Sequence, residues 1–135
     1  MTDSRYVSEN SFYVRYAETD AMGIVHHASY IVYFEEGRSH YSRERGINYA
    51  DFEKTGFWLA VSEVHARYKV PARYGQFLTV RCWVEEARSR SLVFAYEIVD
   101  KASGTVHVTG QTRHICITHE GSVATLPEQW RKLAD

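Results

Sequence analysis

The chain has 135 residues, of which 44% are hydrophobic, and sixteen basic against seventeen acidic residues give a net charge of −1. This length is typical of one domain with an adequate core, and the composition argues against intrinsic disorder. The near-neutral charge argues against a general attraction to nucleic acid. The sequence contains no run of about 20 apolar residues, so we predict no membrane span.

Cysteine content and the N-terminus indicate the compartment. Cys82 and Cys116 are too few for a disulfide framework, and neither belongs to a Cys-x-x-Cys motif. Residues 1–6 lack the apolar segment of a secretory signal. We therefore expect a protein of a reducing compartment, the cytoplasm.

The first half of the chain predicts a strand followed by a long helix. Residues 11–16 are rich in β-forming side chains, and a turn-rich segment follows them. From residue 28 to 45 the apolar residues recur at helical spacing, and Gly46 is a typical helix stop. The face expected to be buried carries Tyr30, Tyr33, Phe34, Gly37 and Tyr41.

After a short helical turn over residues 48–56, everything reads as strand. The predicted strands cover residues 57–70, 77–85, 91–99 and 105–118, with a bulge near Gly110. One strand, one long helix and four closely connected strands indicate an α+β domain with an antiparallel sheet. We expect the outer face and edges of that sheet to need a partner subunit.

The chemistry-bearing segment precedes the helix. Asp20 lies in a turn seven residues before His27, where the helix start presents unpaired backbone N–H groups. A carboxylate beside such an anion site is what acyl transfer to water requires. An Asp in this position is more commonly a local cap, so the residues alone leave its role open.

The same segment resembles a known family. Its pattern is Tyr16-x-x-x-Asp20-x-x-Gly23-Ile24-Val25-x-His27-x-x-Tyr30-x-x-Tyr33-Phe34-Glu35, and the likeness continues in residues 68–74 and 88–94. It resembles the 4-hydroxybenzoyl-CoA thioesterase family, especially the branch of acyl-CoA thioesterases associated with the bacterial Tol–Pal system. The resemblance implies a single hotdog thioesterase domain over residues 1–135, with a long central helix wrapped by a curved antiparallel sheet.

The resemblance also implies roles for individual residues. Asp20 matches the family's catalytic carboxylate, a nucleophile or a general base, and the His27 backbone N–H would polarise the thioester carbonyl. Arg88 and Arg90 match a basic stretch that contacts coenzyme A phosphates. The other substrate-binding residues expected on this basis are Met22, Gly23, Ile24, Val25, Tyr30 and Ser91. Gly23 would let the substrate approach closely.

The implied enzyme is an acyl-CoA thioester hydrolase without a cofactor, a homodimer or homotetramer whose site lies between two subunits. His26 and His27 lack companion ligands at metal spacing, so we expect no metal. Met22 and the aromatic residues Tyr13, Phe57 and Trp58 leave the acyl specificity open.

Two other functions remain open from the sequence. The thioester donor is a carrier protein in some hotdog thioesterases, and Arg88 and Arg90 would then hold phosphopantetheine or an acidic carrier surface. A non-hydrolytic acyl-CoA-binding protein on the same scaffold is the alternative from another class.

Several polar residues are given structural interpretations. We expect Glu18 to face solvent, and Glu35 and Arg38 to form an ion pair on the helix surface or between subunits. Cys82 is expected in the core, and Cys116 is not expected to be a nucleophile. Sheet-surface or interface positions are expected for Glu63, His65, His107 and His114.

Overall fold

The computed structural model describes residues 5–135. Of residues 1–6, where we expect no secretory signal, the first four lie outside the described part. The elements in chain order are β1 (Ser8–Tyr13), η1 (Tyr16–Glu18), α1 (His27–Glu44), α2 (Tyr49–Lys54), β2 (Phe57–Tyr68), β3 (Phe77–Ala87), β4 (Ser91–Asp100), β5 (Val106–Thr118), α3 (Glu128–Arg131) and η2 (Lys132–Ala134).

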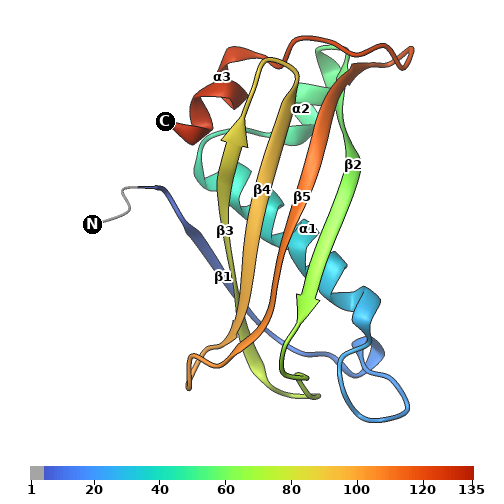
Figure 1. Cartoon of the computed structure of the whole chain (residues 1–135), viewed down its shortest axis with the longest axis vertical. Helices are drawn as coiled ribbons and strands as arrows, with labels where there is room; N and C mark the ends of the chain where they lie inside the picture. Colours follow the sequence, from blue (N-terminus) through green and yellow to red (C-terminus); the bar gives the residue numbers. More distant parts are fainter. Residues whose placement is uncertain (1–4) are drawn as a thin grey trace.

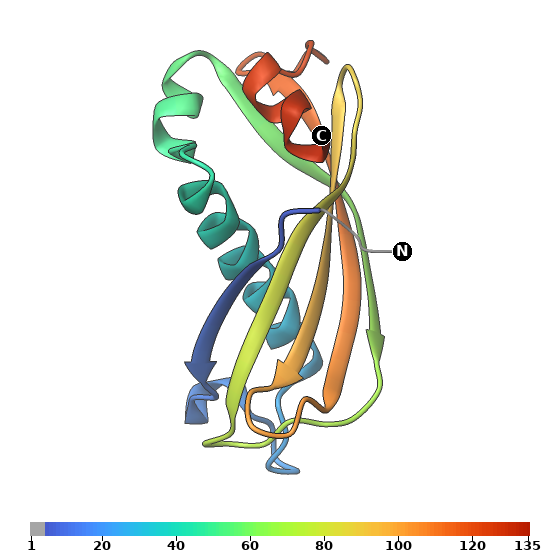
Figure 2. The same ribbon diagram turned by 90° about the vertical axis from the view of Figure 1, so that its left-hand side faces the viewer.

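The five strands form one antiparallel sheet in the order β1-β3-β4-β5-β2 (Figure 1). The sheet curves around α1, which lies along one of its faces (Figure 2). A long helix wrapped by a curved antiparallel sheet is the hotdog fold, and the α+β prediction is confirmed. Both β1 and β2 are edge strands, and β2 is largely exposed along its length.

The local sequence explains where α1 begins and ends. His26 is the N-cap, and its Nδ1 accepts a hydrogen bond from the Ala28 N–H at 3.1 Å. Gly46, with φ of 80°, follows the C-terminal end in the left-handed conformation typical of a helix stop. The predicted buried face is confirmed, because Tyr30, Tyr33, Phe34, Gly37 and Tyr41 are all buried.

Two glycines let α1 approach the sheet closely. A Cβ on Gly110 would lie 2.6 Å from the Phe34 ring, and a Cβ on Gly37 would lie 2.9 Å from Val80. The Phe34 ring also stacks on Tyr96, with ring centroids 4.3 Å apart. The core therefore needs a hydrogen at both positions, because an added methyl group would displace the helix.

The predicted bulge near Gly110 is found on β5, but three residues earlier, at His107, where the register of the β4–β5 pair shifts from Ile98–Val108 to Val99–Val106. Gly110 pairs in register with Ala66 of β2 and Tyr96 of β4. A second register shift lies in the β2–β5 pair, between Val61 and Glu63 of β2. The alternation of β5 is broken at His107, the extra residue, whereas Gly110 marks the close approach of the helix, the other feature that a glycine in a strand indicates.

The boundaries differ from prediction at both ends of the chain. The first strand covers Ser8–Tyr13 rather than residues 11–16, because the chain turns into η1 directly afterwards. The interpretation of everything after Phe57 as strand misses α3 and η2, which bury Trp130 and Leu133.

Candidate active site

The Asp20 turn is held by its own backbone. Asp20 N–H donates to the Ile24 carbonyl at 2.8 Å, and Gly23 N–H donates to the Asp20 carbonyl at 3.0 Å. The Asp20 side chain accepts one hydrogen bond, from the Met22 N–H to Oδ1 at 2.8 Å. Within residues 5–135 no hydrogen bond reaches Oδ2, so this oxygen is available to a water or a substrate.

Gly23 is required by the conformation of this turn. Its φ of 77° lies in the left-handed region, which side chains with a Cβ rarely adopt. A Cβ at this position would meet nothing within 4 Å, so the backbone angle and not crowding by the protein explains the glycine.

The amides at the start of α1 differ in their partners. The Ala28 N–H is bound by His26 Nδ1, and the Ser29 N–H is bound by the His26 carbonyl at 2.9 Å. In the described part of the chain the His27 N–H has no acceptor. This amide lies at the positive end of the helix dipole, which favours an oxyanion or a polarised carbonyl oxygen.

Asp20 and His27 share a cavity of about 280 Å³. One side is formed by the predicted residues Asp20, Met22, Ile24, Val25, His27 and Tyr30. The other side is the segment from Tyr68 to Pro71, which the sequence interpretation gave no role at the site. Tyr68 ties the two sides together, because its hydroxyl donates to the His27 carbonyl at 3.1 Å.

The predicted aromatic lining is only partly found. Tyr30 lines the cavity, and its hydroxyl accepts a hydrogen bond from the Ala72 N–H at 3.1 Å. Burial raises the pKa of Tyr30, which is therefore a neutral hydroxyl at physiological pH. Tyr13, Phe57 and Trp58 do not line this cavity.

The predicted coenzyme A contacts lie elsewhere in the chain. Arg88 and Arg90 lie in the β3–β4 connection and Ser91 begins β4, at the opposite end of the sheet from the Asp20 turn (Figure 1). The Arg88 side chain pairs with Glu86, and the Arg88 N–H donates to the Ser91 carbonyl at 2.8 Å. A single chain therefore does not bring these residues to Asp20.

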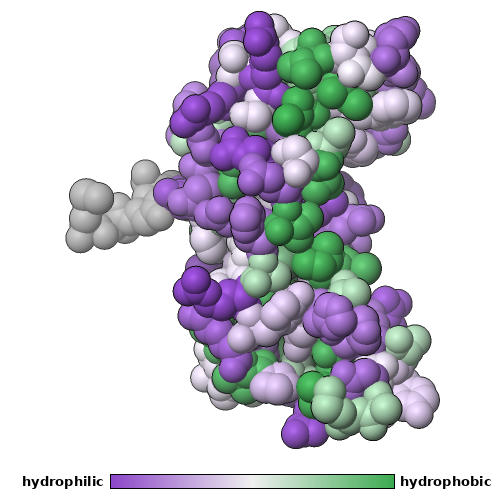
Figure 3. Space-filling model, turned by 45° about the vertical axis from the view of Figure 1, so that its right-hand side comes forward, coloured by the Kyte–Doolittle hydropathy of each residue, from purple (hydrophilic) through white to green (hydrophobic). Residues whose placement is uncertain are grey.

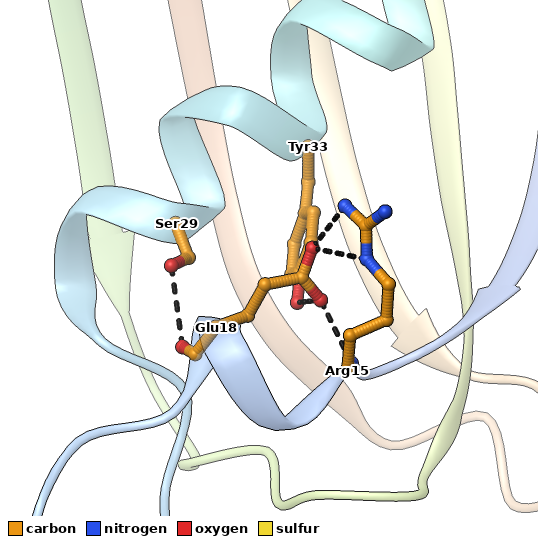
Figure 4. A network of polar contacts seen from close by, with 4 residues as sticks. All are labelled: Arg15, Glu18, Ser29 and Tyr33. Carbon is orange, nitrogen blue, oxygen red and sulfur yellow. Dashed lines mark hydrogen bonds and ion pairs between the residues drawn. The ribbon is translucent and has the colours of Figure 1, made fainter.

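The expectation that Glu18 faces solvent is wrong. Its side chain is 12% exposed and lies between Arg15 and Tyr33 (Figure 4). Oε1 accepts from the Arg15 N–H and from the Tyr33 hydroxyl, each at 2.8 Å, and Oε2 accepts from the Arg15 guanidinium at 2.6 and 3.0 Å. No local pattern predicts this contact, because Tyr33 lies on the helix, fifteen residues further on.

Glu18 links the Asp20 turn to α1. Its backbone carbonyl accepts from the His26 N–H at 2.8 Å and from the Ser29 hydroxyl at 3.2 Å (Figure 4). Burial by itself raises the pKa of the Glu18 carboxyl, but the hydrogen bonds from Arg15 and Tyr33 outweigh this effect and leave it lowered. The carboxylate is therefore ionised where it accepts these bonds.

The prediction of sheet-surface or interface positions is wrong for two strand histidines. His107 and His114 are each 2% exposed. Burial, with a smaller effect from the nearby Arg38 cation, lowers the pKa of His114 to about 4, so its ring is neutral at pH 7. The expectation for Cys82 is confirmed, because it is fully buried in the core.

Other kinds of site are not found in residues 5–135. No group of three His, Cys, Asp or Glu residues is arranged to hold a metal ion. No described helix has both the length and the apolar character needed to cross a membrane. Cys82 and Cys116 are free thiols, and burial raises the pKa of both, which disfavours the reactive thiolate.

Comparison with known proteins identifies relatives of the whole chain. The family described as the thioesterase-like superfamily matches residues 10–132. "Putative acyl-CoA thioesterase YneP" of Bacillus subtilis is 38% identical over 127 residues, which cover 94% of this chain and 89% of that protein.

Solved structures agree with this result. The DHNA-CoA thioesterase from Staphylococcus aureus is 35% identical, with a TM-score of 0.85 over 89% of this chain and 80% of that one. The 1,4-dihydroxy-2-naphthoyl-CoA thioesterase Slr0204 from Synechocystis has a TM-score of 0.88, with 96% of both chains covered. Its 22% identity supports the shared fold alone.

Proposed function

Because the chain belongs to the thioesterase-like superfamily, we propose that it is an acyl-CoA thioester hydrolase. The observation that carries the proposal is the shared cavity of Asp20 and His27, where a carboxylate oxygen and a helix-start amide that have no hydrogen-bond partner among the described residues meet apolar walls. These are the groups that thioester hydrolysis requires. The names of the relatives agree with this activity.

The proposed reaction uses water and no cofactor. The thioester carbonyl oxygen accepts the His27 N–H, and Asp20 removes a proton from a water that attacks the carbonyl carbon. The tetrahedral intermediate then releases coenzyme A as its thiolate, which takes up a proton, and a carboxylic acid remains. In the nucleophilic alternative Asp20 attacks the carbonyl carbon first and displaces the coenzyme A thiolate, which takes up a proton, and water then hydrolyses the resulting anhydride to the carboxylic acid and the free Asp20 carboxylate.

The apolar part of the cavity is assigned to the acyl group. Met22, Ile24, Val25 and Tyr30 would contact it, and Gly23 keeps the turn in the required conformation. We also propose that, within the superfamily, the chain is related specifically to the 4-hydroxybenzoyl-CoA thioesterases and to the Tol–Pal-associated branch. We place the activity in the reducing cytoplasm, which suits the two free thiols.

We further propose that the enzyme is at least a homodimer formed through β2. A band of hydrophobic residues runs along this side of the molecule (Figure 3). On β2 the exposed Trp58, Val61, Val64 and Tyr68 accompany an unpaired strand edge. Such an edge is normally covered by another strand, and a second copy offers the same surface.

This dimer explains the position of the basic residues. If two β2 strands pair antiparallel about a two-fold axis, the β3–β4 connection of one copy approaches the Asp20 end of the other. Arg88, Arg90 and Ser91 of one subunit would then bind the coenzyme A phosphates of a thioester held by Asp20 and His27 of its partner.

The test is thiol release from short, medium, long and aromatic acyl-CoAs. We expect Asp20→Asn to lower turnover by about 10²–10³-fold or more, since loss of one preorganised group has this effect. Asp51→Asn is the matched control, because Asp51 is an exposed carboxylate on α2. Unchanged turnover in Asp20→Asn would refute the assignment.

Two further outcomes redirect the proposal. If the enzyme hydrolyses an acyl-carrier protein and none of the CoA esters, the thioester donor is a carrier protein. Tight binding of CoA esters without thiol release would favour a binding protein. Sedimentation of the active species as a monomer would refute the shared site.

A further inference from the structure

A second cavity lies at the other half of α1. Its volume is about 180 Å³, and it is lined by residues of α1, α2, α3 and the sheet, none of which lines the Asp20 cavity. Arg38 on its α1 wall is eleven residues from His27, which corresponds to about 16 Å along the helix. The two cavities are therefore separate places on the chain.

Arg38 supplies a mostly buried positive charge to this second cavity. Its side chain is 20% exposed and contacts the Tyr96 hydroxyl. Within the described residues the only carboxylate within 4.0 Å is that of Glu35, at 4.0 Å, and Glu35 is 69% exposed. The predicted Glu35–Arg38 ion pair is thus at the limit of contact.

Other arginines of the chain are paired more closely. Arg81 meets Glu97 at 2.9 Å, and Arg113 meets Glu63 at 2.9 Å, although both arginines are more exposed than Arg38. A buried cation is normally compensated by an anion at hydrogen-bond distance. Arg38 is the reverse case, a mostly buried guanidinium with no carboxylate of residues 5–135 closer than 4.0 Å.

The remaining polar groups around Arg38 do not supply an anion. The neutral His114 ring is engaged, with Nε2 at 2.8 Å from the Thr112 hydroxyl. Tyr49 oxygen accepts the Leu59 N–H at 3.0 Å, which leaves the Tyr49 hydroxyl proton free to donate. The apolar side of the cavity is formed by Leu59, Phe94 and Trp130.

We propose that this second cavity binds a small organic carboxylate, with the carboxylate on Arg38 and its apolar body against Leu59, Phe94 and Trp130. The volume is close to the roughly 150 Å³ of a cavity that holds benzene, so benzoate is a suitable probe. The apolar wall favours an organic acid over inorganic phosphate. The site does not depend on the proposed hydrolase activity.

The test is titration of the full chain with benzoate, and with benzamide as its neutral analogue, by calorimetry. Benzoate binds the wild type, and benzamide binds at least tenfold more weakly. Arg38→Gln weakens benzoate binding at least tenfold. Arg43→Gln, an exposed arginine on the same helix, and Asp20→Asn both retain it.

A crystal structure with 4-bromobenzoate locates the ligand independently of any variant. A bromine signal in the Arg38 cavity supports the proposal even if Arg38→Gln fails to fold. The proposal is overturned by bromine only in the Asp20 cavity, by a side chain of a second copy filling the Arg38 cavity, by equal binding of benzamide, or by no binding of benzoate.

Discussion

The hydrogen bond between Tyr33 and Glu18 is predicted to stabilise the fold through the charge of the carboxylate. Tyr33 is 4% exposed, and its hydroxyl donates to Oε1 at 2.8 Å. Hydrogen bonds to charged groups contribute about 1.5–3 kcal/mol, and neutral ones about 0.5–1.5 kcal/mol. Tyr33→Phe should therefore lower the free energy of unfolding by about 1.5–3 kcal/mol.

Glu18→Gln separates the charge from the hydrogen bond, since glutamine keeps an acceptor of the same shape. A double-mutant cycle of Glu18→Gln and Tyr33→Phe should give a coupling energy of about 1–1.5 kcal/mol, the difference between a charged and a neutral bond. The exposed Arg15 guanidinium stays in both Tyr33 backgrounds, so its contribution cancels in the cycle.

The coupling should depend on pH in a defined direction. Folding lowers the pKa of Glu18, so its stabilising contribution is present above the unfolded pKa of about 4.3. The contribution is lost as the pH falls through the lower pKa of the folded state. We expect coupling at pH 7 and little coupling in acid.

Urea unfolding of the four proteins at both pH values measures the coupling. Glu36→Gln is the matched control, because Glu36 is an exposed carboxylate on the same helix and should not couple to Tyr33. Hydrogen exchange should also be faster at the His26 amide in Glu18→Gln, since the Glu18 carbonyl holds it. Additive single-mutant energies at pH 7 would refute the reasoning.

Three further predictions concern single positions. Gly110→Ala should destabilise the protein by about 1–3 kcal/mol in urea unfolding, because the added methyl group overlaps the Phe34 ring. Gly23→Ala should lower stability by about 1–2 kcal/mol through its positive φ, and thiol release should fall with it. Folding lowers the pKa of His114 to about 4, so the wild type should lose up to about 3 kcal/mol as the pH falls from 6.5 to 4, and His114→Gln should not show this loss.

The parts of the structure that follow from local sequence were predictable. The helical spacing of Tyr30, Phe34 and Tyr41 located α1 to within one residue at each end. Most of the predicted site lies in one continuous stretch from Asp20 to Tyr30, and a short turn before a helix start keeps such residues together. The arrangement of these residues could therefore be predicted without knowledge of the rest of the fold.

The parts that depend on distant contacts were not predictable. Tyr68 reaches the His27 carbonyl from a strand 41 residues away, and Glu18 is buried by a tyrosine on the helix. The bulge of β5 was predicted three residues too far along the strand, because a glycine in a strand pattern marks either a bulge or a close approach. The location of Arg88 and Arg90 at the far end of the sheet likewise follows from topology and not from local pattern.

The close approach of α1 to the sheet has a mechanical consequence for the amide at its start. The helix rests on Gly110 through Phe34, so this contact acts as a pivot, and His27 lies seven residues, or about 10 Å, beyond it. A tilt of about 5° at the pivot would move the His27 amide by roughly 1 Å, and in the proposed mechanism a displacement of this size would reduce catalysis about 10²-fold. The volume of the side chains in the middle of α1 therefore determines the position of the His27 amide at its start.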